Sequence, residues 1–173
     1  MQDTRNVTDE FKGMSEEEII KTLDSRGSGL HIAIENLERD FNMGSIVRTA
    51  NAFGVRHVHI IGRRQWNKRG AMATDKYLHV EYHPTVDDFV AHLNDNRQIV
   101  VVDNIDGAID MQKASLSATC VLVFGSEKSG VSDDMKAVAS SVVAIRQLGS
   151  TRSLNVGAAA AIAMYEWTRR HVY

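Results

Sequence analysis

The sequence has very little cysteine and lacks any long hydrophobic stretch. Its single cysteine, Cys120, leaves no internal disulfide to form, and its place in the apolar run 120–124 favours a packed core thiol over a nucleophile. The first twelve residues are polar and mixed in charge, and no segment approaches the length of a membrane span. These absences predict a cytoplasmic protein with no membrane partner.

Several catalytic signatures are also missing. Gly125 and Gly130 have the spacing that opens a phosphate-binding loop, but Val131 stands where that motif needs lysine. No G-x-G-x-x-G follows a predicted strand, and no G-x-S-x-G occurs. Nucleoside triphosphate, dinucleotide and serine hydrolase chemistry are therefore disfavoured.

Seven histidines raise the question of a metal site. His57 and His59 share one face of a predicted strand, and His79 and His83 fall on nearby segments. No cysteine pair or helical H-E-x-x-H accompanies them. We therefore expect structural or surface histidines and no bound metal.

The chain divides into an N-terminal helical appendage, residues 1–29, and one domain, residues 30–173. In the appendage, Ser15 and the three glutamates after it start a helix, which the break at 27–29 ends. In the domain, strands and helices alternate. Strands are expected at 30–36, 57–62, 77–82, 99–102, 121–124 and 141–145, and helices at 44–53, 86–93, 132–139 and 155–170.

That order predicts an α/β fold with a mostly parallel sheet and helices on both faces. Ligands of such sheets collect at the loops beyond the carboxyl ends of the strands. The informative loops should therefore follow Asn36, Val102, Phe124 and Ile145.

The first of these loops leads to Asn42, Gly44 and Arg48. Asn42 is placed to cap the helix expected from Gly44, and Arg48 lies one turn further on, where it can bind a phosphate. When the pair is taken alone, an N-cap and a surface arginine are the better explanation.

Two later loops are rich in glycine, amide and hydroxyl groups. The glycines at 125 and 130 let a ligand approach the backbone, and Glu127 can accept a hydrogen bond from a sugar hydroxyl or an amine. Ser153 or Asn155 is expected to cap the last helix, whose alanines at 158–161 allow close packing.

The densest basic cluster is a candidate for phosphate contact. Its cations neutralise phosphates, and its indole offers a surface on which a base can stack. A solvated loop is the alternative, and the net charge of −2 does not by itself indicate nucleic acid. The cluster consists of Arg63, Arg64, Trp66, Lys68 and Arg69.

Taken in order, the three loops resemble the signature motifs of the SpoU/TrmH family of SPOUT RNA 2′-O-ribose methyltransferases. The resemblance covers about residues 30–170, nearly the whole predicted domain. The matching segments are Asn42-x-Gly44-x-x-x-Arg48-Thr49-Ala50 with Ala52-Phe53-Gly54, Phe124-Gly125-x-Glu127-x-x-Gly130, and Ser153-Leu154-Asn155-Val156 with Tyr165-Glu166.

This resemblance implies a C-terminal deep trefoil knot, homodimerisation through the knotted region, and an active site that combines groups from both subunits. It implies S-adenosylmethionine as the cofactor, held by backbone groups at Gly125, Ile145 and Leu154, with the loop 102–104 adjoining. The implied partner is a structured RNA, either tRNA or rRNA.

The resemblance also implies that Arg48 is the principal catalytic residue, supported by Asn42, Glu127, Ser153 and Asn155. A free guanidinium stays protonated, so an RNA phosphate paired with Arg48 is an alternative proton acceptor. The chain departs from the family where Ile145-Arg146-Gln147 replaces Ile-Pro-Met and Gly157 replaces a common serine. These departures bear on cofactor affinity.

Two other functions stay open. One is a catalytically silent RNA-binding or assembly protein with the same fold, and the other is a SPOUT enzyme that methylates a base nitrogen. Asn42, Arg48 and the Ser-Leu-Asn motif argue against the latter.

Overall fold

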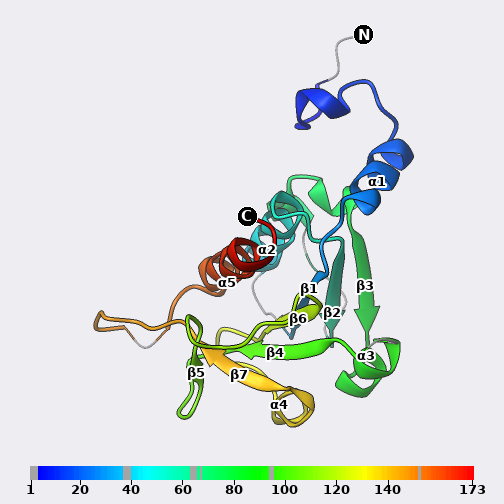
Figure 1. The fold of residues 1–173 in the computed structure, drawn as a ribbon. Helices are drawn as coiled ribbons and strands as arrows, with labels where there is room; N and C mark the ends of the chain where they lie inside the picture. Colours follow the sequence, from blue (N-terminus) through cyan, green and yellow to red (C-terminus); the bar gives the residue numbers. More distant parts are fainter. Residues whose placement is uncertain (1–3, 37–39, 63–65, 67, 94–95, 152) are drawn as a thin grey trace.

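The computed structural model describes residues 4–36, 40–62, 66, 68–93, 96–151 and 153–173. Seven strands form one sheet in the order β3-β2-β1-β6-β4-β7-β5 (Figure 1), and every strand pairing among these residues is parallel. The predicted α/β fold is confirmed. The strands are β1 (Leu30–Glu35), β2 (His57–Ile61), β3 (His79–His83), β4 (Gln98–Val102), β5 (Ile109–Asp110), β6 (Cys120–Phe124) and β7 (Ser141–Ala144).

Helices cover both faces of the sheet, as predicted. On one face α2 and α5 pack against each other and against the even-numbered side chains of β1 (Figure 1). On the other face Phe89 of α3 and Met135 of α4 meet a second core that includes Ala33. The α-helices are α1 (Glu16–Ser25), α2 (Asp40–Ala52), α3 (Val86–His92), α4 (Asp133–Val138) and α5 (Val156–His171), and the 3-10 helices are η1 (Asp9–Phe11), η2 (Lys68–Ala71) and η3 (Thr74–Tyr77).

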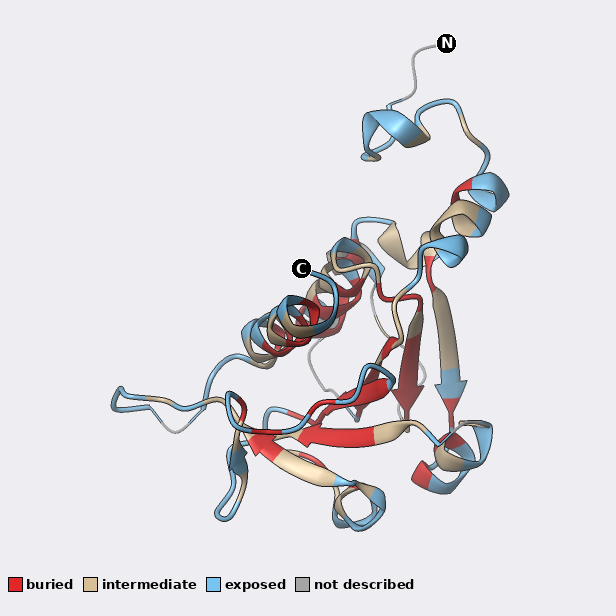
Figure 2. Ribbon diagram, viewed as in Figure 1, coloured by how far each residue is buried: buried red, intermediate tan, exposed pale blue. Residues whose placement is uncertain are grey.

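The central strands are buried on both sides because each faces a helical layer (Figure 2). Successive side chains of a strand point to opposite faces, so Ile32 joins the core under α2 and Ala33 joins the core under α3. Cys120 is fully buried, and burial raises the pKa of its thiol to about 12. The prediction of a core thiol is confirmed.

Helix α2 begins at Asp40, four residues before the predicted start at Gly44. In its first turn the apolar Phe41 is 79% exposed while the polar Asn42 is buried, which is the reverse of the pattern from which a helix is predicted. The prediction that Asn42 caps the helix is therefore wrong. Arg48 likewise lies two turns into the helix and not near its start.

Two strands also differ from the prediction. The third begins at His79 and not at 77, because residues Thr74–Tyr77 form the 3-10 helix η3. Strand β5 was not predicted at all, since its two residues are too few to show a period of two. Its parallel pairing with β7 depends on the tertiary fold.

Helix α1 has the N-terminal signal that the sequence indicated. The Ser15 hydroxyl accepts a hydrogen bond from the Glu18 amide at 3.2 Å, and the Ser15 amide donates to the Glu18 carboxylate at 2.7 Å. Asp24, near the end of α1, accepts a hydrogen bond from Arg56 Nε at 2.7 Å and contacts His79 Nε2 at 2.9 Å. These contacts fasten α1 to the sheet. None of the helices within the described ranges has the length and apolar character needed to cross a bilayer.

The C-terminal half of α5 is fastened to the loop after β5 by one arginine. Arg170 donates from Nη2 to the Met111 carbonyl at 2.7 Å and is held by Glu166, which accepts from Arg170 Nε at 2.8 Å. Arg169 donates to the same carboxylate at 2.9 Å. The hydrogen bond from Arg169, followed by that from Arg170, lowers the pKa of Glu166 to about 2.

We predict that Glu166→Gln destabilises the fold by about 1–2 kcal/mol at neutral pH. This is less than the roughly 1.5–3 kcal/mol of a hydrogen bond to a charged group, because solvent screens the exposed Arg169. The folded pKa of Glu166, about 2, lies below the ordinary value of 4.5, so its contribution is complete above pH 4.5 and is lost as the pH falls towards 2. Urea unfolding at pH 7 and at pH 3 should show a smaller difference between variant and wild type at pH 3. Asp106→Asn, in an exposed loop, is the control; a difference for Glu166→Gln that is equal at both pH values would contradict this account.

Candidate active site

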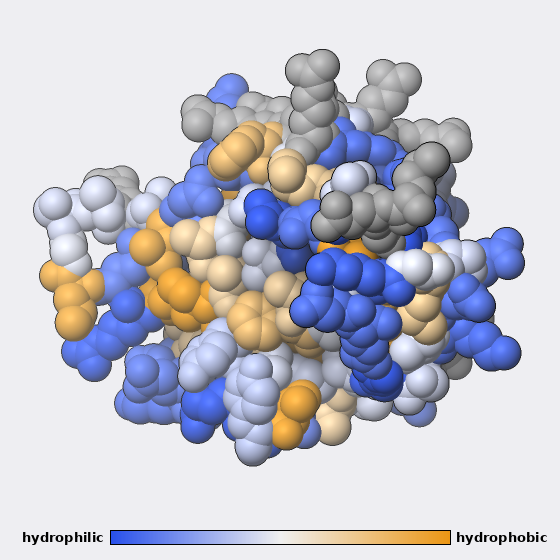
Figure 3. All heavy atoms as spheres, turned by 90° about the horizontal axis from the view of Figure 1, so that it is seen from above, coloured by the Kyte–Doolittle hydropathy of each residue, from blue (hydrophilic) through white to orange (hydrophobic). Residues whose placement is uncertain are grey.

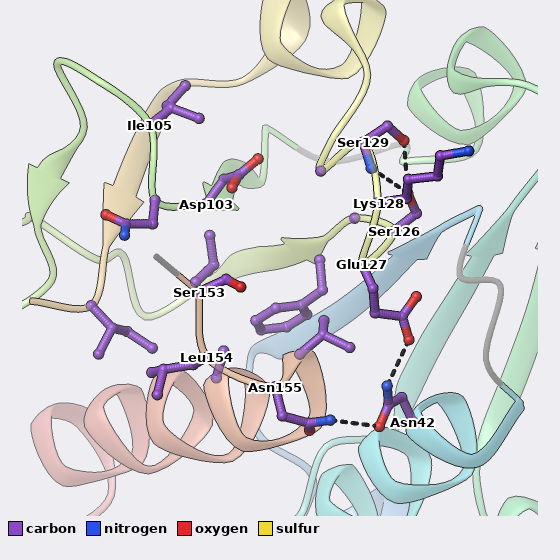
Figure 4. A pocket seen from close by; sticks show the side chains of 18 of the residues that line it. Asn42, Asp103, Ile105, Ser126, Glu127, Lys128, Ser129, Ser153, Leu154 and Asn155 are labelled. Atoms are coloured by element: carbon purple, nitrogen blue, oxygen red, sulfur yellow. Dashed lines mark hydrogen bonds between the residues drawn. The ribbon is translucent and has the colours of Figure 1, made fainter. Parts of the chain in front are cut away.

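A cavity of about 520 Å³ opens beyond the carboxyl ends of β4, β6 and β7 (Figure 4). Its walls are the loops that follow Val102, Phe124 and Ala144, together with the start of α5 and Asn42 of α2. The sequence predicted ligand binding at these loops, and the structure brings them together. Segments separated by more than a hundred residues thus form a single pocket of the size that small molecules and cofactors occupy.

The loop after β6 folds into a tight hairpin whose backbone forms one wall of the cavity. Ser126 and Gly130 exchange two backbone hydrogen bonds, at 3.0 and 2.9 Å. A Cβ on Gly125 would lie 2.2 Å from the carbonyl carbon of Gly130, so only glycine permits this closure. Asp103, from the loop after β4, accepts a hydrogen bond from the Val131 amide at 3.3 Å and so joins the two loops.

Three polar side chains form a hydrogen-bonded chain along the edge of the cavity (Figure 4). Asn42 donates to Glu127 Oε1 at 2.6 Å, and Asn155 donates to Asn42 Oδ1 at 3.0 Å. Asn155 Oδ1 accepts in turn from the Ala158 amide at 3.1 Å and so caps α5. The chain explains why Asn42 is not a helix cap: both ends of its amide are engaged across the site.

The predicted cofactor residues Gly125, Ile145 and Leu154 all line the cavity, as does Ser153. Gln147, from the same loop as Ile145, also lines it. Gln147 Oε1 is buried and has no hydrogen-bond partner among the residues that the structure describes. A buried amide oxygen of this kind costs about 1–3 kcal/mol unless it accepts a hydrogen bond, which makes this wall suited to a donor group of a ligand.

Arg48 is not among the residues that line the cavity. Its side chain is exposed on α2, and it makes no hydrogen bond or ion pair with any residue in the described part of the chain. The structure of one chain therefore brings together four of the five predicted catalytic residues and leaves the guanidinium facing outward.

The predicted RNA-binding loop is described only in part. Arg63 and Arg64 lie outside the described residues, as does the side chain of Arg69. Trp66 is half-buried and packs against the main core, while Lys68 is exposed and forms an ion pair with Asp75 at 2.9 Å. Gly70 packs on Gly44 of α2, since a Cβ on Gly44 would lie 2.6 Å from Gly70 Cα. The loop thus borders the helix that carries Asn42 and Arg48.

The sequence did not single out two further residues of the site. Asp103 was covered only by the expectation that the loop 102–104 adjoins the cofactor, and Gln147 was noted only as a departure from the family pattern. No spacing rule identifies either residue. A carboxylate or amide just after a buried strand is the one signal that points to them.

Comparisons with known proteins agree with these motifs. A family model described as the SpoU rRNA Methylase family matches residues 29–165. The tRNA (guanosine(18)-2′-O)-methyltransferase of Escherichia coli strain K12 is 30% identical over 156 residues, which cover 88% of this chain and 68% of that protein. The enzyme of the same name from Thermus thermophilus is 28% identical over 159 residues, covering 89% of this chain and 81% of that protein.

Solved structures show the same fold. The TrmH/SpoU tRNA modifying enzyme of A. aeolicus superimposes with a TM-score of 0.79 at 26% identity, over 90% of this chain and 81% of that one. The SpoU methyltransferase AviRb from Streptomyces viridochromogenes, in complex with the cofactor AdoMet, superimposes with a TM-score of 0.76 at 22% identity. That match covers 82% of this chain and 57% of AviRb, and it supports the fold alone.

We predict that Gly125→Ala weakens S-adenosylmethionine binding by at least about tenfold, because the added methyl group forces apart the hairpin that closes on Gly130. Isothermal titration calorimetry with the cofactor measures the change. Gly149→Ala is the matched control, since a Cβ there meets no atom within 4 Å. Equal affinity in the two variants would show that this hairpin does not shape the cofactor site.

Proposed function

Because the chain belongs to the SpoU rRNA methylase family, as the match over residues 29–165 shows, we propose that it methylates the ribose 2′-oxygen of a transfer RNA. The family match and the tRNA 2′-O-methyltransferases to which the chain is similar identify it as an S-adenosylmethionine-dependent RNA 2′-O-methyltransferase. Transfer RNA is the proposed substrate because the relatives that match most of the chain carry tRNA in their names. A ribose methyltransferase works where its RNA is, so the proposed location is the cytoplasm.

The observation that carries this proposal is the chain Glu127–Asn42–Asn155 at the mouth of the cavity. It joins one residue from each of the three family motifs through hydrogen bonds of 2.6 and 3.0 Å. Carboxylate and amide groups of this kind bind hydroxyl groups such as those of ribose. The chain therefore supports a sugar hydroxyl as the reacting group.

The residues of the cavity fit S-adenosylmethionine. The backbone at Gly125, Ile145 and Leu154 would hold the cofactor, and the unpartnered Gln147 Oε1 would accept a hydrogen bond from one of its amino groups. Bound there, the cofactor supplies a methyl group on a positively charged sulfur. Arg146 and Gln147, which differ from the usual family residues, are compatible with cofactor binding in this cavity. The side chain of Arg146 is exposed to solvent, and Gln147 offers a hydrogen-bond acceptor.

The protein's own contribution to the reaction is positioning and charge. Glu127, Asn42, Ser153 and Asn155 are proposed to orient the ribose so that its 2′-oxygen faces the methyl group. The 2′-hydroxyl must lose its proton as the new carbon–oxygen bond forms. Arg48 cannot accept that proton, so we assign it the binding of an RNA phosphate whose oxygen takes the proton.

Arg48 faces away from the cavity of its own chain, which favours an active site shared between two copies. Exposed apolar side chains lie on α5 and on the loop before it: Leu148, Leu154, Ile162 and Tyr165 are 87%, 38%, 44% and 51% exposed. Hydrophobic residues gather on the face seen in Figure 3. Such a surface suits a homodimer interface. The same loop and α5 are the segment proposed to thread the trefoil knot.

Residues 30–173 are proposed as the methyltransferase domain, in keeping with the family match, and residues 1–29 as an appendage fastened through Asp24. The basic loop is proposed to bind RNA phosphates, with Lys68 exposed beside α2. Trp66 is half-buried, so its indole offers a base only part of its surface.

We predict that Arg48→Ala lowers kcat for transfer of labelled methyl groups to bulk tRNA by about 10²–10³-fold, the range for removing one charge-stabilising donor. The dissociation constant for S-adenosylmethionine should change less than about twofold, because Arg48 does not line the cavity. Arg26→Ala, an arginine more than half exposed on the N-terminal segment, is the control and should keep full activity.

Nucleoside analysis of the product completes this test. The 2′-O-methyl nucleoside should appear with tRNA and be absent with the Arg48→Ala variant. A methylated base, or methylation of rRNA in preference to tRNA, would refute the proposed substrate or reaction.

A shared active site predicts complementation between two inactive variants. Arg48→Ala and Glu127→Gln, co-expressed and mixed at random, form heterodimers in which one of the two sites combines an intact Arg48 with an intact Glu127 from the other chain. Activity should recover to about one quarter of wild type, since half of the dimers are mixed and each has one working site. If both residues act within one chain, mixing restores nothing.

A further inference from the structure

Six of the seven histidines gather at the end of the sheet away from the active-site cavity. Parallel pairing aligns His31, His57 and His79 across β1, β2 and β3, and aligns His59 with Glu81 two residues further along. Side chains two residues apart share a face, so these groups project to the side covered by α3. None of them lines the cavity. The cluster comprises His31, His57, His59, His79, His83 and His92, with Glu81 among them.

The rings are connected through their nitrogens. His59 is 1% exposed; its Nε2 contacts His31 Nδ1 at 3.0 Å, and its Nδ1 contacts His83 Nε2 at 3.0 Å. Glu81 Oε1 accepts a hydrogen bond from His57 Nδ1 at 2.8 Å, and Glu81 Oε2 forms an ion pair with His92 Nε2. His59 and His83 are buried at strand positions that normally carry valine or isoleucine, so their nitrogen donors require a chemical explanation.

We propose that His59, Glu81 and His92 form a binding site for a divalent transition-metal ion, with Zn²⁺ as the ion that suits these donors. Each residue offers one ligand atom, and the three atoms lie within 4.8 Å of one another. Within the described residues this is the one group of histidine, cysteine and carboxylate side chains that meets that geometry. Two imidazoles and one carboxylate are a donor set that zinc accepts, with a fourth position for water or another imidazole.

The surroundings have the second layer of contacts that metal sites require. A ligating imidazole normally uses its other nitrogen, and a ligating carboxylate its other oxygen, in a hydrogen bond that fixes its orientation. His59 has such a contact to His31, and Glu81 has one to His57. His83 lies beside His59, and its ring centroid is 5.0 Å from that of His92, which makes it the candidate fourth ligand.

The site is also accessible and able to adjust. Zinc–nitrogen and zinc–oxygen bonds of about 2.0–2.2 Å require the three ligand atoms, which lie within 4.8 Å of one another, to rearrange around the ion. The ion would take the place of the direct contact between Glu81 and His92. His92 is the last residue of α3 and its side chain is half exposed, so it can move towards His59 and give the ion a path from solvent.

A bound ion would join α3 to β2 and β3, because His92 belongs to α3, His59 to β2 and Glu81 to β3. This role is independent of methyl transfer, since the sheet order places β4, β6 and β7, which surround the cavity, on the other side of β1.

The test uses the full chain without an affinity tag, freed of metal with a chelator and titrated with ZnCl₂ in a calorimeter. We expect one zinc ion per chain and a melting temperature that rises with zinc concentration by mass action. His92→Ala and Glu81→Gln should each weaken zinc binding by about 10–100-fold. His171→Asn is the matched control, because His171 lies at the end of α5 and contacts the Leu116 carbonyl, outside the cluster. This variant should bind zinc like wild type.

Two results would overturn the proposal. One is the absence of stoichiometric zinc binding by the wild-type chain, and the other is binding that survives in both His92→Ala and Glu81→Gln. Because the His92 side chain is half exposed, its truncation leaves the core intact, and circular dichroism of the zinc-free variants confirms folding. Substitution with Co²⁺ adds a direct readout: its visible absorption should report nitrogen and oxygen coordination in wild type and change in His92→Ala.

Discussion

The hydrogen-bonded chain Glu127–Asn42–Asn155 is the interaction on which the active-site architecture depends. It joins the loop after β6, the first turn of α2 and the N-cap of α5, three segments far apart in the sequence. If Asn42 lost either partner, a buried amide group would be left unsatisfied, at a cost of about 1–3 kcal/mol. The bonds that we propose to orient polar groups towards a substrate therefore also fix α2 and α5 relative to the sheet.

The parallel sheet makes this meeting possible. In the order β1-β6-β4-β7, neighbouring strands all end at one edge, so the loops that follow them become neighbours whatever their separation in sequence. Because residue 125 is glycine, the backbone at Gly125 can lie against Gly130 and close the hairpin after β6. Asp103 joins that hairpin to the loop after β4. The side chain of Arg146 is exposed, and Arg146 is not among the residues that line the pocket.

The sequence predicted most accurately those elements whose signal lies in a few consecutive residues. Apolar runs located β4, β6 and β7 within one residue at each end, and hydroxyl and amide caps located α4 and α5. The start of α2 was missed because its first turn exposes the apolar Phe41 and buries the polar Asn42. Asn42 was interpreted as a cap because its actual partners, Glu127 and Asn155, are distant in sequence. Tertiary contacts decided both features, and no local pattern contains them.

The histidine cluster is a second feature that sequence spacing could not predict. Residue spacing paired His57 with His59 on one strand, and a search for helical metal motifs then found nothing. The ligand geometry arises from strand register, which sets Glu81 beside His59, and from α3 folding back so that His92 meets both. A metal site assembled across parallel strands has no characteristic spacing, because the loops between the strands can have any length. The sequence signal is histidine at buried strand positions that usually carry aliphatic side chains, such as His59 and His83. That signal can be interpreted only when the strand register is known.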